Sequence, residues 1–193
     1  MEPVRSFIAI ELPDELKQQL TRLETELKKD GPPGVKWVSP ESIHLTLKFL
    51  GNIAADKIEA VTGVMTESVR GIVPFRLSAR GLGVFPNPKR AQVVWVGMEG
   101  DLDQLRQLQK QLEAELARLG FPPEARAFTP HLTLARLRNY ASPEERQRFG
   151  RLIADREFSA GDIEVESLSL MRSQLTRSGA VYSRLSSVRL TGK

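Results

Sequence analysis

Apolar and polar residues alternate along the chain with two periods, one typical of helices and one typical of strands. Leucines recur at intervals of three and four between Leu16 and Leu27, which places them on one face of a helix. A longer leucine stripe from Leu102 to Leu119 predicts a second core-facing helix. Short apolar runs between turn residues indicate strands. The full pattern predicts helices over residues 14–29, 56–70, 102–119 and 142–153, and strands over 4–11, 35–38, 43–50, 75–84, 92–98, 128–137, 158–172 and 181–190.

The order of these elements favours an α+β fold built from two similar halves. Both halves contain the same tetrapeptide. His-Leu-Thr-Leu occurs at 44–47 and again at 131–134, and these two copies hold both histidines of the chain. An internal duplication explains this repeat better than chance does. The last two strands are expected to join near Ser178.

Strand geometry predicts where the side chains of the repeat point. Successive residues of a strand face opposite sides, so each His shares a face with the Thr two positions later, and the leucines face a core. If a pseudo-twofold relates the halves, two imidazoles and two hydroxyls meet at one site. Imidazoles have ordinary pKa values near 6.5, so one can accept a proton and the other donate one at neutral pH. The hydroxyls can donate hydrogen bonds to phosphate oxygens.

Two basic residues stand close to the motifs. Arg136 follows His131 by five positions, and strict alternation places it on the leucine face. A bulge, the strand end or its own long side chain must bring it to the histidine face. Lys48 has the parity to join His44 and Thr46, and a solvated lysine at the strand end is an equal alternative.

Two further aromatic positions each have a simple structural explanation. The loop Phe85–Arg90 combines an aromatic side chain with two basic ones. An ordinary hairpin loop explains it, and an RNA contact by stacking and phosphate binding is the alternative. Trp95 lies within an apolar strand and is expected in the core.

The amino-acid composition excludes several kinds of metal site and catalytic group. The 193 residues include no cysteine, which excludes disulfides, iron–sulfur clusters, cysteine-ligated zinc and a thiol nucleophile. Two histidines are too few for a three-histidine metal site. No apolar run is long enough to span a membrane, and the N-terminus predicts a strand, so we expect a cytoplasmic protein. The net charge of +4 comes mainly from arginines in residues 126–193. A phosphate-bearing partner and a plain solvated surface both explain it.

Paired H-x-T-hydrophobic motifs at this separation resemble those of the two-histidine (2H) phosphoesterases. Within these, the chain is similar to the RNA 2′,3′-cyclic phosphodiesterases, historically called 2′-5′ RNA ligases. The likeness lies in RSFIAIELP, HLTLKFLG, VVWVGM and FTPHLTLAR. It implies one bilobal domain over residues 1–193, with two α+β lobes, each an antiparallel sheet flanked by helices, arched over a central cleft. It also implies a monomer that uses no metal and no other cofactor.

The resemblance also implies a reaction and its residues. RNA 2′,3′-cyclic phosphate ends, those of transfer-RNA fragments among them, or nucleotide 2′,3′-cyclic phosphates would be opened to a 2′-phosphate, with weak reverse 2′-5′ ligation. The matching positions are the catalytic histidines His44 and His131, the phosphate-binding Thr46, Thr133 and Arg136, and Phe49 near the nucleoside.

We expect water to attack phosphorus in line with the departing 3′-oxygen. His131 as base and His44 as acid is the working assignment, which sequence alone does not decide. A non-catalytic RNA- or nucleotide-binding module on the same fold is one alternative, and a phosphodiesterase for small cyclic nucleotides is another. Intact HxT pairs in both halves argue against the binding module, because binding alone needs no matched acid and base.

Overall fold

Two antiparallel sheets form the framework of the computed structural model, which describes residues 2–177 and 179–192. The first sheet has the order β3-β1-β8-β9, and the second has the order β2-β6-β5-β4-β7. The strands of the first sheet are β1 (Val4–Glu11), β3 (His44–Ile53), β8 (Ser167–Thr176) and β9 (Gly179–Arg189). Those of the second are β2 (Val35–Trp37), β4 (Phe75–Phe85), β5 (Val93–Gly100), β6 (His131–Leu137) and β7 (Ser159–Val165). The predicted α+β fold with antiparallel sheets is confirmed.

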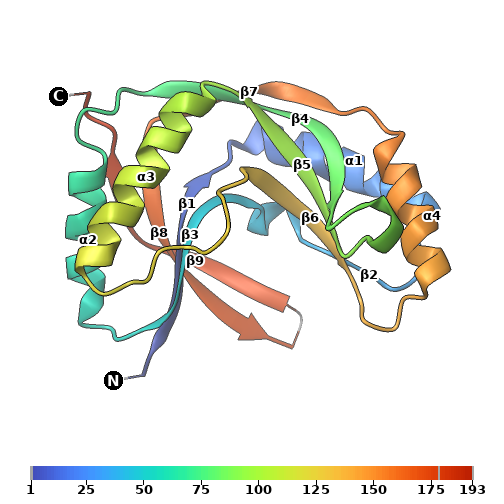
Figure 1. The fold of residues 1–193 in the computed structure, drawn as a ribbon, viewed down its shortest axis with the longest axis horizontal. Coiled ribbons are helices and arrows are strands. Elements are labelled where there is room, and N and C mark those ends of the chain that lie inside the picture. Colours follow the sequence, from blue (N-terminus) through green and yellow to red (C-terminus); the bar gives the residue numbers. More distant parts are fainter. Residues whose placement is uncertain (1, 178, 193) are drawn as a thin grey trace.

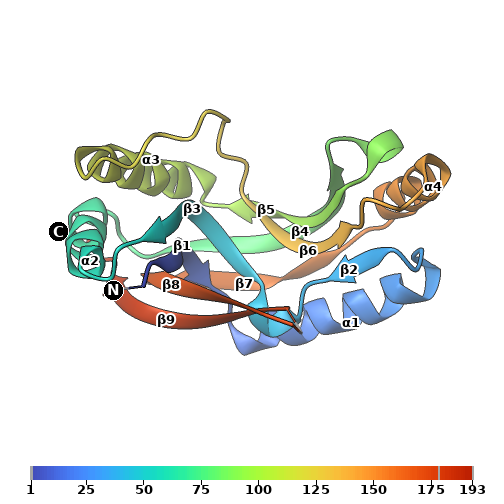
Figure 2. The same ribbon diagram turned by 90° about the horizontal axis from the view of Figure 1, so that it is seen from below.

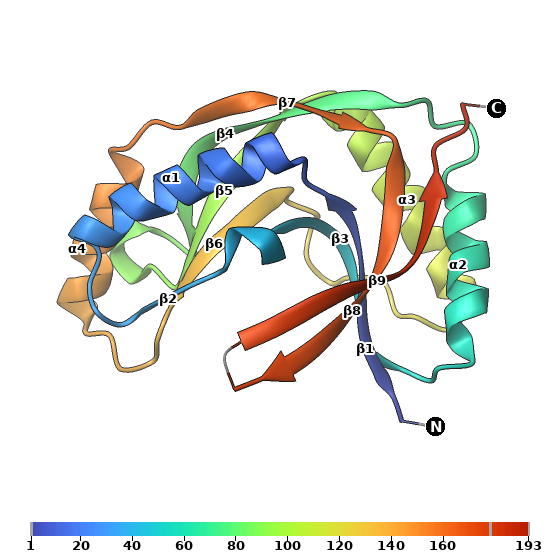
Figure 3. The same cartoon turned by 180° about the vertical axis from the view of Figure 1, so that it is seen from behind.

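The helices lie in two groups at opposite ends of the molecule (Figures 1 and 2). Contacts join α2 to α3 and α2 to β9, while α1 contacts β7 and α4 contacts β4. Seen from behind, α1 lies across the second sheet, and the β8–β9 hairpin projects away from it (Figure 3). The helices are α1 (Asp14–Asp30), α2 (Lys57–Ser68), α3 (Leu102–Arg118) and α4 (Pro143–Ala154), and the single 3₁₀ turns are η1 (Pro40–Ser42) and η2 (Pro88–Arg90).

Local sequence explains both the helix boundaries and the faces that the helices bury. Ser142 Oγ accepts a hydrogen bond from the Glu145 amide at 3.2 Å, and the Glu145 carboxylate accepts one from the Ser142 amide at 2.8 Å. This capping box begins α4. The leucine stripe of α1 and the central leucines of the α3 stripe are buried as predicted, while Leu102 and Leu119 at its ends are half-buried, and both stripes join the two sheets in one hydrophobic cluster. No helix within the described ranges is long and apolar enough to cross a membrane.

The two sheets repeat one arrangement. In each sheet, the strand that begins with the motif histidine pairs antiparallel with an earlier strand, and a long helix lies between the two in the sequence. These pairs are β3 with β1 and β6 with β5. Each sheet nevertheless contains strands from both halves of the chain, because β8 pairs with β1 and β9 with β8 in the first sheet, while β2 pairs with β6 in the second. The two sequence halves therefore do not fold as two separate lobes.

One predicted strand was wrong. Residues 158–172 form two strands, β7 in the second sheet and β8 in the first, with Glu166 between them. The sequence pattern does not show where the chain leaves one sheet for the other, because apolar residues continue on both sides of Glu166. Ser178, where the last turn was expected, lies outside the described residues.

Candidate active site

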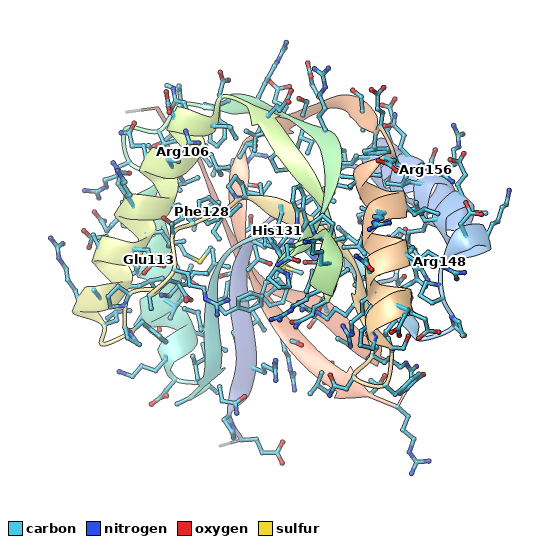
Figure 4. All side chains as sticks on the ribbon, turned by 45° about the vertical axis from the view of Figure 1, so that its right-hand side comes forward. Arg106, Glu113, Phe128, His131, Arg148 and Arg156 are labelled. Carbon is cyan, nitrogen blue, oxygen red and sulfur yellow. The ribbon has the colours of Figure 1, made fainter. Side chains whose placement is uncertain are left out.

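The two motif strands lie against each other although they belong to different sheets. The backbone between them explains this contact. The Val38 amide, just past β2, donates a 2.8 Å hydrogen bond to the carbonyl of Leu134 on β6. From Val38 the chain reaches His44 through residues 39–43, which include the 3₁₀ turn η1. The first histidine is thus tethered to the strand of the second motif. His131 lies near the middle of the molecule, between α3 and α4 (Figure 4).

Each motif strand turns its leucines inward and its His and Thr outward. Leu45 and Leu47 are buried, and so are Leu132 and Leu134. The histidines and threonines between them are half-buried. This confirms the predicted alternation. We call the faces that present His44, Thr46, His131 and Thr133 the histidine faces.

A β-bulge interrupts both strands at the same motif position. Thr46 pairs with Ala9 and Lys48 with Ile8, so Leu47 is an extra residue. In the second motif Thr133 pairs with Trp95 and Ala135 with Val94, so the extra residue comes again at the fourth motif position. A bulge of this kind shifts the parity of every later side chain.

The two bulges decide which residues join the histidine faces. Phe49 and Arg136 are turned to these faces and are exposed, with 65% of Phe49 accessible. Lys48 and Ala135 are turned inward and are buried. The bulge considered for Arg136 is therefore present, and Phe49 occupies the equivalent place in the first motif. Both expectations for Lys48 were wrong, because it neither joins His44 nor lies in solvent.

Lys48 instead connects the first motif to the segment that leads into the second. Its ammonium donates hydrogen bonds to the Glu113 carboxylate on α3 at 3.0 Å and to the Pro122 carbonyl at 2.7 Å. Glu124 Oε1 lies 3.7 Å from the same nitrogen. Figure 4 shows Glu113 on α3 and Phe128 on the segment that runs on to His131. A buried ammonium requires such partners, and these contacts tie α3 and residues 122–124 to β3.

Both imidazoles are oriented in the same way. Nδ1 of His44 lies 3.0 Å from the Ser42 carbonyl, and Nδ1 of His131 lies 2.7 Å from the Thr129 carbonyl. A carbonyl only accepts, so each Nδ1 is the protonated donor. This leaves Nε2 of each ring to accept a proton, or to donate one when the ring is charged.

The two histidines have different partners on the neighbouring strands. Glu11 is the cross-strand partner of His44, whereas Gly97 is the partner of His131. The Glu11 carboxylate accepts hydrogen bonds from Ser169 at 2.6 Å and from Arg184 at 2.7 Å. Burial alone would raise the pKa of Glu11, but these two bonds, together with the charges of Arg184 and His44, outweigh it and hold the pKa below its usual value. Glu11 is therefore a carboxylate, and its negative charge lies beside His44.

Burial lowers the pKa of His44. The hydrogen bond to Ser42 and the charge of Glu11 both oppose this shift, and the nearby charge of Lys17 adds to it. Burial has the largest effect, because it disfavours the charged imidazolium. His44 is consequently a neutral proton acceptor in the ligand-free protein at neutral pH.

Aromatic side chains surround the histidine faces, and the sequence identified only some of them. Phe7 and Tyr182 pack edge-on against His44, with ring centroids 5.7 and 5.4 Å away, and neither was expected there. Phe85 packs edge-on against His131 at 5.1 Å. Neither interpretation of the loop Phe85–Arg90 predicted this contact. Phe49 lies 6.0 Å from Phe7. The alternation of side chains along β1 places Phe7 on the strand face opposite the one that carries the core residues. This was the one sequence signal that could have placed Phe7 beside His44.

Trp95 corrects another expectation. It is half-buried and is the cross-strand partner of Thr133, so it lies on the histidine face instead of in the core. Its ring packs over Gly83 and lies 5.3 Å from Phe85. A Cβ atom at Gly83 would collide with this ring, so the glycine leaves the space that the indole occupies.

Arg136 brings a positive charge to the histidine faces. Neither a hydrogen bond nor an ion pair of the Arg136 side chain occurs in residues 2–177 and 179–192. Its guanidinium is free to bind an anion, and the Thr hydroxyls stand beside the same faces. The described parts of the chain contain no group of three or more Asp, Glu or His residues arranged to bind a metal.

Fold and site together define a bilobal α+β protein in which two equivalent strands each present a histidine and a threonine. The family profile described as LigT like Phosphoesterase matches the chain twice, over residues 10–95 and 96–182, once for each motif. The chain belongs to this family, the 2H phosphoesterases.

Two relatives are similar over almost the whole chain. An RNA 2′,3′-cyclic phosphodiesterase of Methanothermobacter thermautotrophicus is 37% identical over 97% of this chain and 99% of its own length. The protein of the same name from Thermotoga maritima is 35% identical over 93% of this chain and 91% of its own.

Solved structures agree with this fold. A crystal structure of a Thermus thermophilus protein superposes with a TM-score of 0.80 at 30% identity, and it covers 98% of this chain and 99% of its own. E. coli LigT in complex with 3′-AMP superposes with a TM-score of 0.76 at 30% identity, with the same coverage.

Proposed function

We propose that this chain hydrolyses the 2′,3′-cyclic phosphate at the end of an RNA to a 2′-phosphate, without a metal. The observation that carries the proposal is the matched pair of imidazoles, each held by its Nδ1 proton on one of two contacting strands. Such a pair suits general acid–base catalysis, because both Nε2 atoms remain available. The activity named for the relatives supports the same reaction.

The proposed reaction is an in-line displacement at phosphorus. A bond forms between a water oxygen and phosphorus, and the bond from phosphorus to the ribose 3′-oxygen breaks. One imidazole takes the proton of the water at Nε2, and the other imidazole donates its proton to the departing 3′-oxygen. When the 5′-hydroxyl of another RNA takes the place of water, the same imidazoles assist formation of the bond from phosphorus to that 5′-oxygen and breakage of the bond to the 3′-oxygen. Weak formation of 2′-5′ linkages from a 2′,3′-cyclic phosphate end therefore follows from the same residues.

The remaining site residues bind the substrate in this proposal. Thr46, Thr133 and Arg136 bind the non-bridging phosphate oxygens, where a fixed positive charge stabilises the extra negative charge of the transition state. Phe49 offers an exposed aromatic face for the terminal base. The low pKa of His44 favours a neutral ring before substrate binds, and an anionic phosphate nearby favours the charged form afterwards. His131 as base and His44 as acid therefore remains the assignment to be tested.

Hydrolysis of 2′,3′-cyclic AMP tests the function directly. Phosphorus NMR should identify the product as the 2′-phosphate, and an excess of EDTA should leave the rate unchanged. Substitution of His44 or His131 by Ala should lower kcat by roughly 10²–10⁴-fold. Binding without turnover would favour the RNA- or nucleotide-binding module, and a rate in EDTA that only added metal restores would reject the mechanism.

We further propose that residues 1–193 act as one bilobal domain and as a monomer in the cytoplasm. The two histidines come from different sheets of one chain, which supports a single catalytic unit. Comparison of cyclic-phosphate-ended RNA with mononucleotides separates an RNA enzyme from a phosphodiesterase of small cyclic nucleotides. Sedimentation of the active protein at assay concentration tests the monomer.

A further inference from the structure

A small hollow adjoins Arg136 on the side away from His131. It lies between the start of β5, the end of β6 and the start of α4, and its volume is about 230 Å³. We call it the rim hollow; its lining residues are Gln92, Val93, Arg136, Leu137, Asn139 and Arg146. Because β6 runs from His131 to Leu137, Arg136 stands between the proposed catalytic histidine and this hollow.

The lining of the rim hollow is positively charged. It contains two guanidinium groups and two primary amides, and it contains no carboxylate. Arg146 is held in place by hydrogen bonds to the carbonyls of Ala91 at 2.9 Å, Arg138 at 2.8 Å and Ala141 at 3.2 Å. Carbonyl acceptors fix a guanidinium without cancelling its charge, so the positive potential in the hollow is preserved.

No acidic partner neutralises this region. Across the described residues, neither Arg136 nor Arg146 forms a salt bridge, and the same holds for Lys36, the cross-strand partner of Arg136. A larger hollow beside α1 and β7 has the opposite character, because five of its lining residues are Asp or Glu: Glu11, Glu15, Asp162, Glu164 and Glu166. A polyanion is therefore attracted to the rim hollow and repelled from the other.

The size of the rim hollow suits a phosphate with part of a ribose. The volume of about 230 Å³ is several times the roughly 30 Å³ that a water molecule takes up in the liquid, so the hollow has room for a phosphate group and the atoms next to it. The amide groups of Gln92 and Asn139 supply neutral N–H donors, and the guanidinium of Arg146 supplies charge. This combination of donors binds a phosphodiester and carries no information about base identity.

We propose that the rim hollow binds the phosphodiester one nucleotide upstream of the terminal cyclic phosphate, so that the substrate class is an RNA strand instead of a free nucleotide. This proposal rests on the proposed function. Arg136 contacts the cyclic phosphate on one side and borders the upstream phosphate on the other. An oligonucleotide gains the second contact, whereas a 2′,3′-cyclic mononucleotide has no group to place there.

The test compares 2′,3′-cyclic AMP with a tri-adenylate that ends in a 2′,3′-cyclic phosphate. The wild-type kcat/KM should be at least about tenfold higher for the trinucleotide, as expected for one charged phosphate contact. The double variant Gln92→Glu with Asn139→Asp keeps the side-chain shapes and places negative charge in the hollow. It should lose about tenfold on the trinucleotide and less than about twofold on 2′,3′-cyclic AMP.

A matched control separates the hollow from a general charge effect. Gln18→Glu with Gln107→Glu makes the same change in net charge on exposed faces of α1 and α3, and it should leave both substrates unaffected. For the trinucleotide, the slope of log kcat/KM against log salt concentration should become less steep by about one in the hollow variant. The same slope should not change in the control variant. Equal losses on both substrates, or no loss on either, would overturn the subsite. Failure of the wild type to hydrolyse either substrate would instead overturn the proposed function.

Discussion

Lys48 in the first motif donates a 2.7 Å hydrogen bond to the carbonyl of Pro122, nine positions before His131 in the second motif. The lysine side chain is only 3% exposed, and it also pairs with Glu113. The first motif thus holds the segment that carries Thr129, whose carbonyl orients the second imidazole. Ala135 occupies the equivalent position, directly after the bulge, in the other half, so this link exists on one side only.

Lys48→Met should therefore weaken the fold and the orientation of His131 together. Removing one partner of a buried charge pair costs about 3–5 kcal/mol, and the partial exposure of Glu113 and Glu124 places the expected loss near the lower end. Hydrogen exchange of residues 121–130 should accelerate, and kcat should fall more than KM changes. Arg118→Met, which breaks an exposed pair with Glu115, should cost no more than about 1 kcal/mol. Unchanged exchange in residues 121–130 would refute the link.

The division of labour between the two histidines can be read from the leaving group. A substrate with sulfur in place of the 3′-oxygen releases a thiolate, which needs no proton from the enzyme because thiols are far more acidic than alcohols. We expect His44→Ala to regain most of its lost rate on this substrate and His131→Ala to regain none. Rescue of His131→Ala alone reverses the roles, and rescue of both or of neither contradicts a separate acid and base.

The titration of His44 depends on Glu11. Burial lowers the pKa of His44, and the negative charge of Glu11 partly opposes that shift. The chain has two histidines, so proton NMR should show two imidazole titrations, with that of His44 below the ordinary value of about 6.5. Glu11→Gln removes the opposing charge and should move the His44 titration to still lower pH. A shift to higher pH would mean that Glu11 does not act on the ring through its charge.

Glu24 should make stability depend on pH. Its side chain is 2% exposed, and its Oε1 has no hydrogen-bond partner in residues 2–177 and 179–192. Burial raises its pKa from 4.5 to about 7, against the opposing charge of Lys28. The folded state therefore binds a proton that the unfolded state has released, and stability falls as pH rises from about 4.5 to 7.

Glu24→Gln removes this penalty. At pH 8 the variant should be more stable by up to about 3 kcal/mol, the free energy of a shift of this size. At pH 4 both proteins have an uncharged group at this position, so their stabilities should agree. Urea unfolding at the two pH values measures the difference. Equal stabilities at pH 8 would show that Glu24 titrates normally.

Much of the architecture followed from local sequence. The leucine stripes of α1 and α3, the capping box at Ser142 and the alternation in both HLTL segments each reflect interactions within a few residues of one another. The split of residues 158–172 between two sheets did not follow, because strand partners far away in the chain decide where each strand goes. Phe7 and Tyr182 were missed beside His44 for the same reason, since their contacts join distant strands.

The sequence by itself determined which residues are available for chemistry: two histidines, each in an H-x-T setting that repeats, in a chain with no cysteine. Tertiary structure alone decided which neighbours join them. A bulge at the fourth position of each motif turns Phe49 and Arg136 toward the histidine faces and buries Lys48 and Ala135. The physical reason is that a bulge depends on the register between two paired strands, which the sequence of one strand does not show. One extra residue then reverses the face to which every later side chain of the strand points.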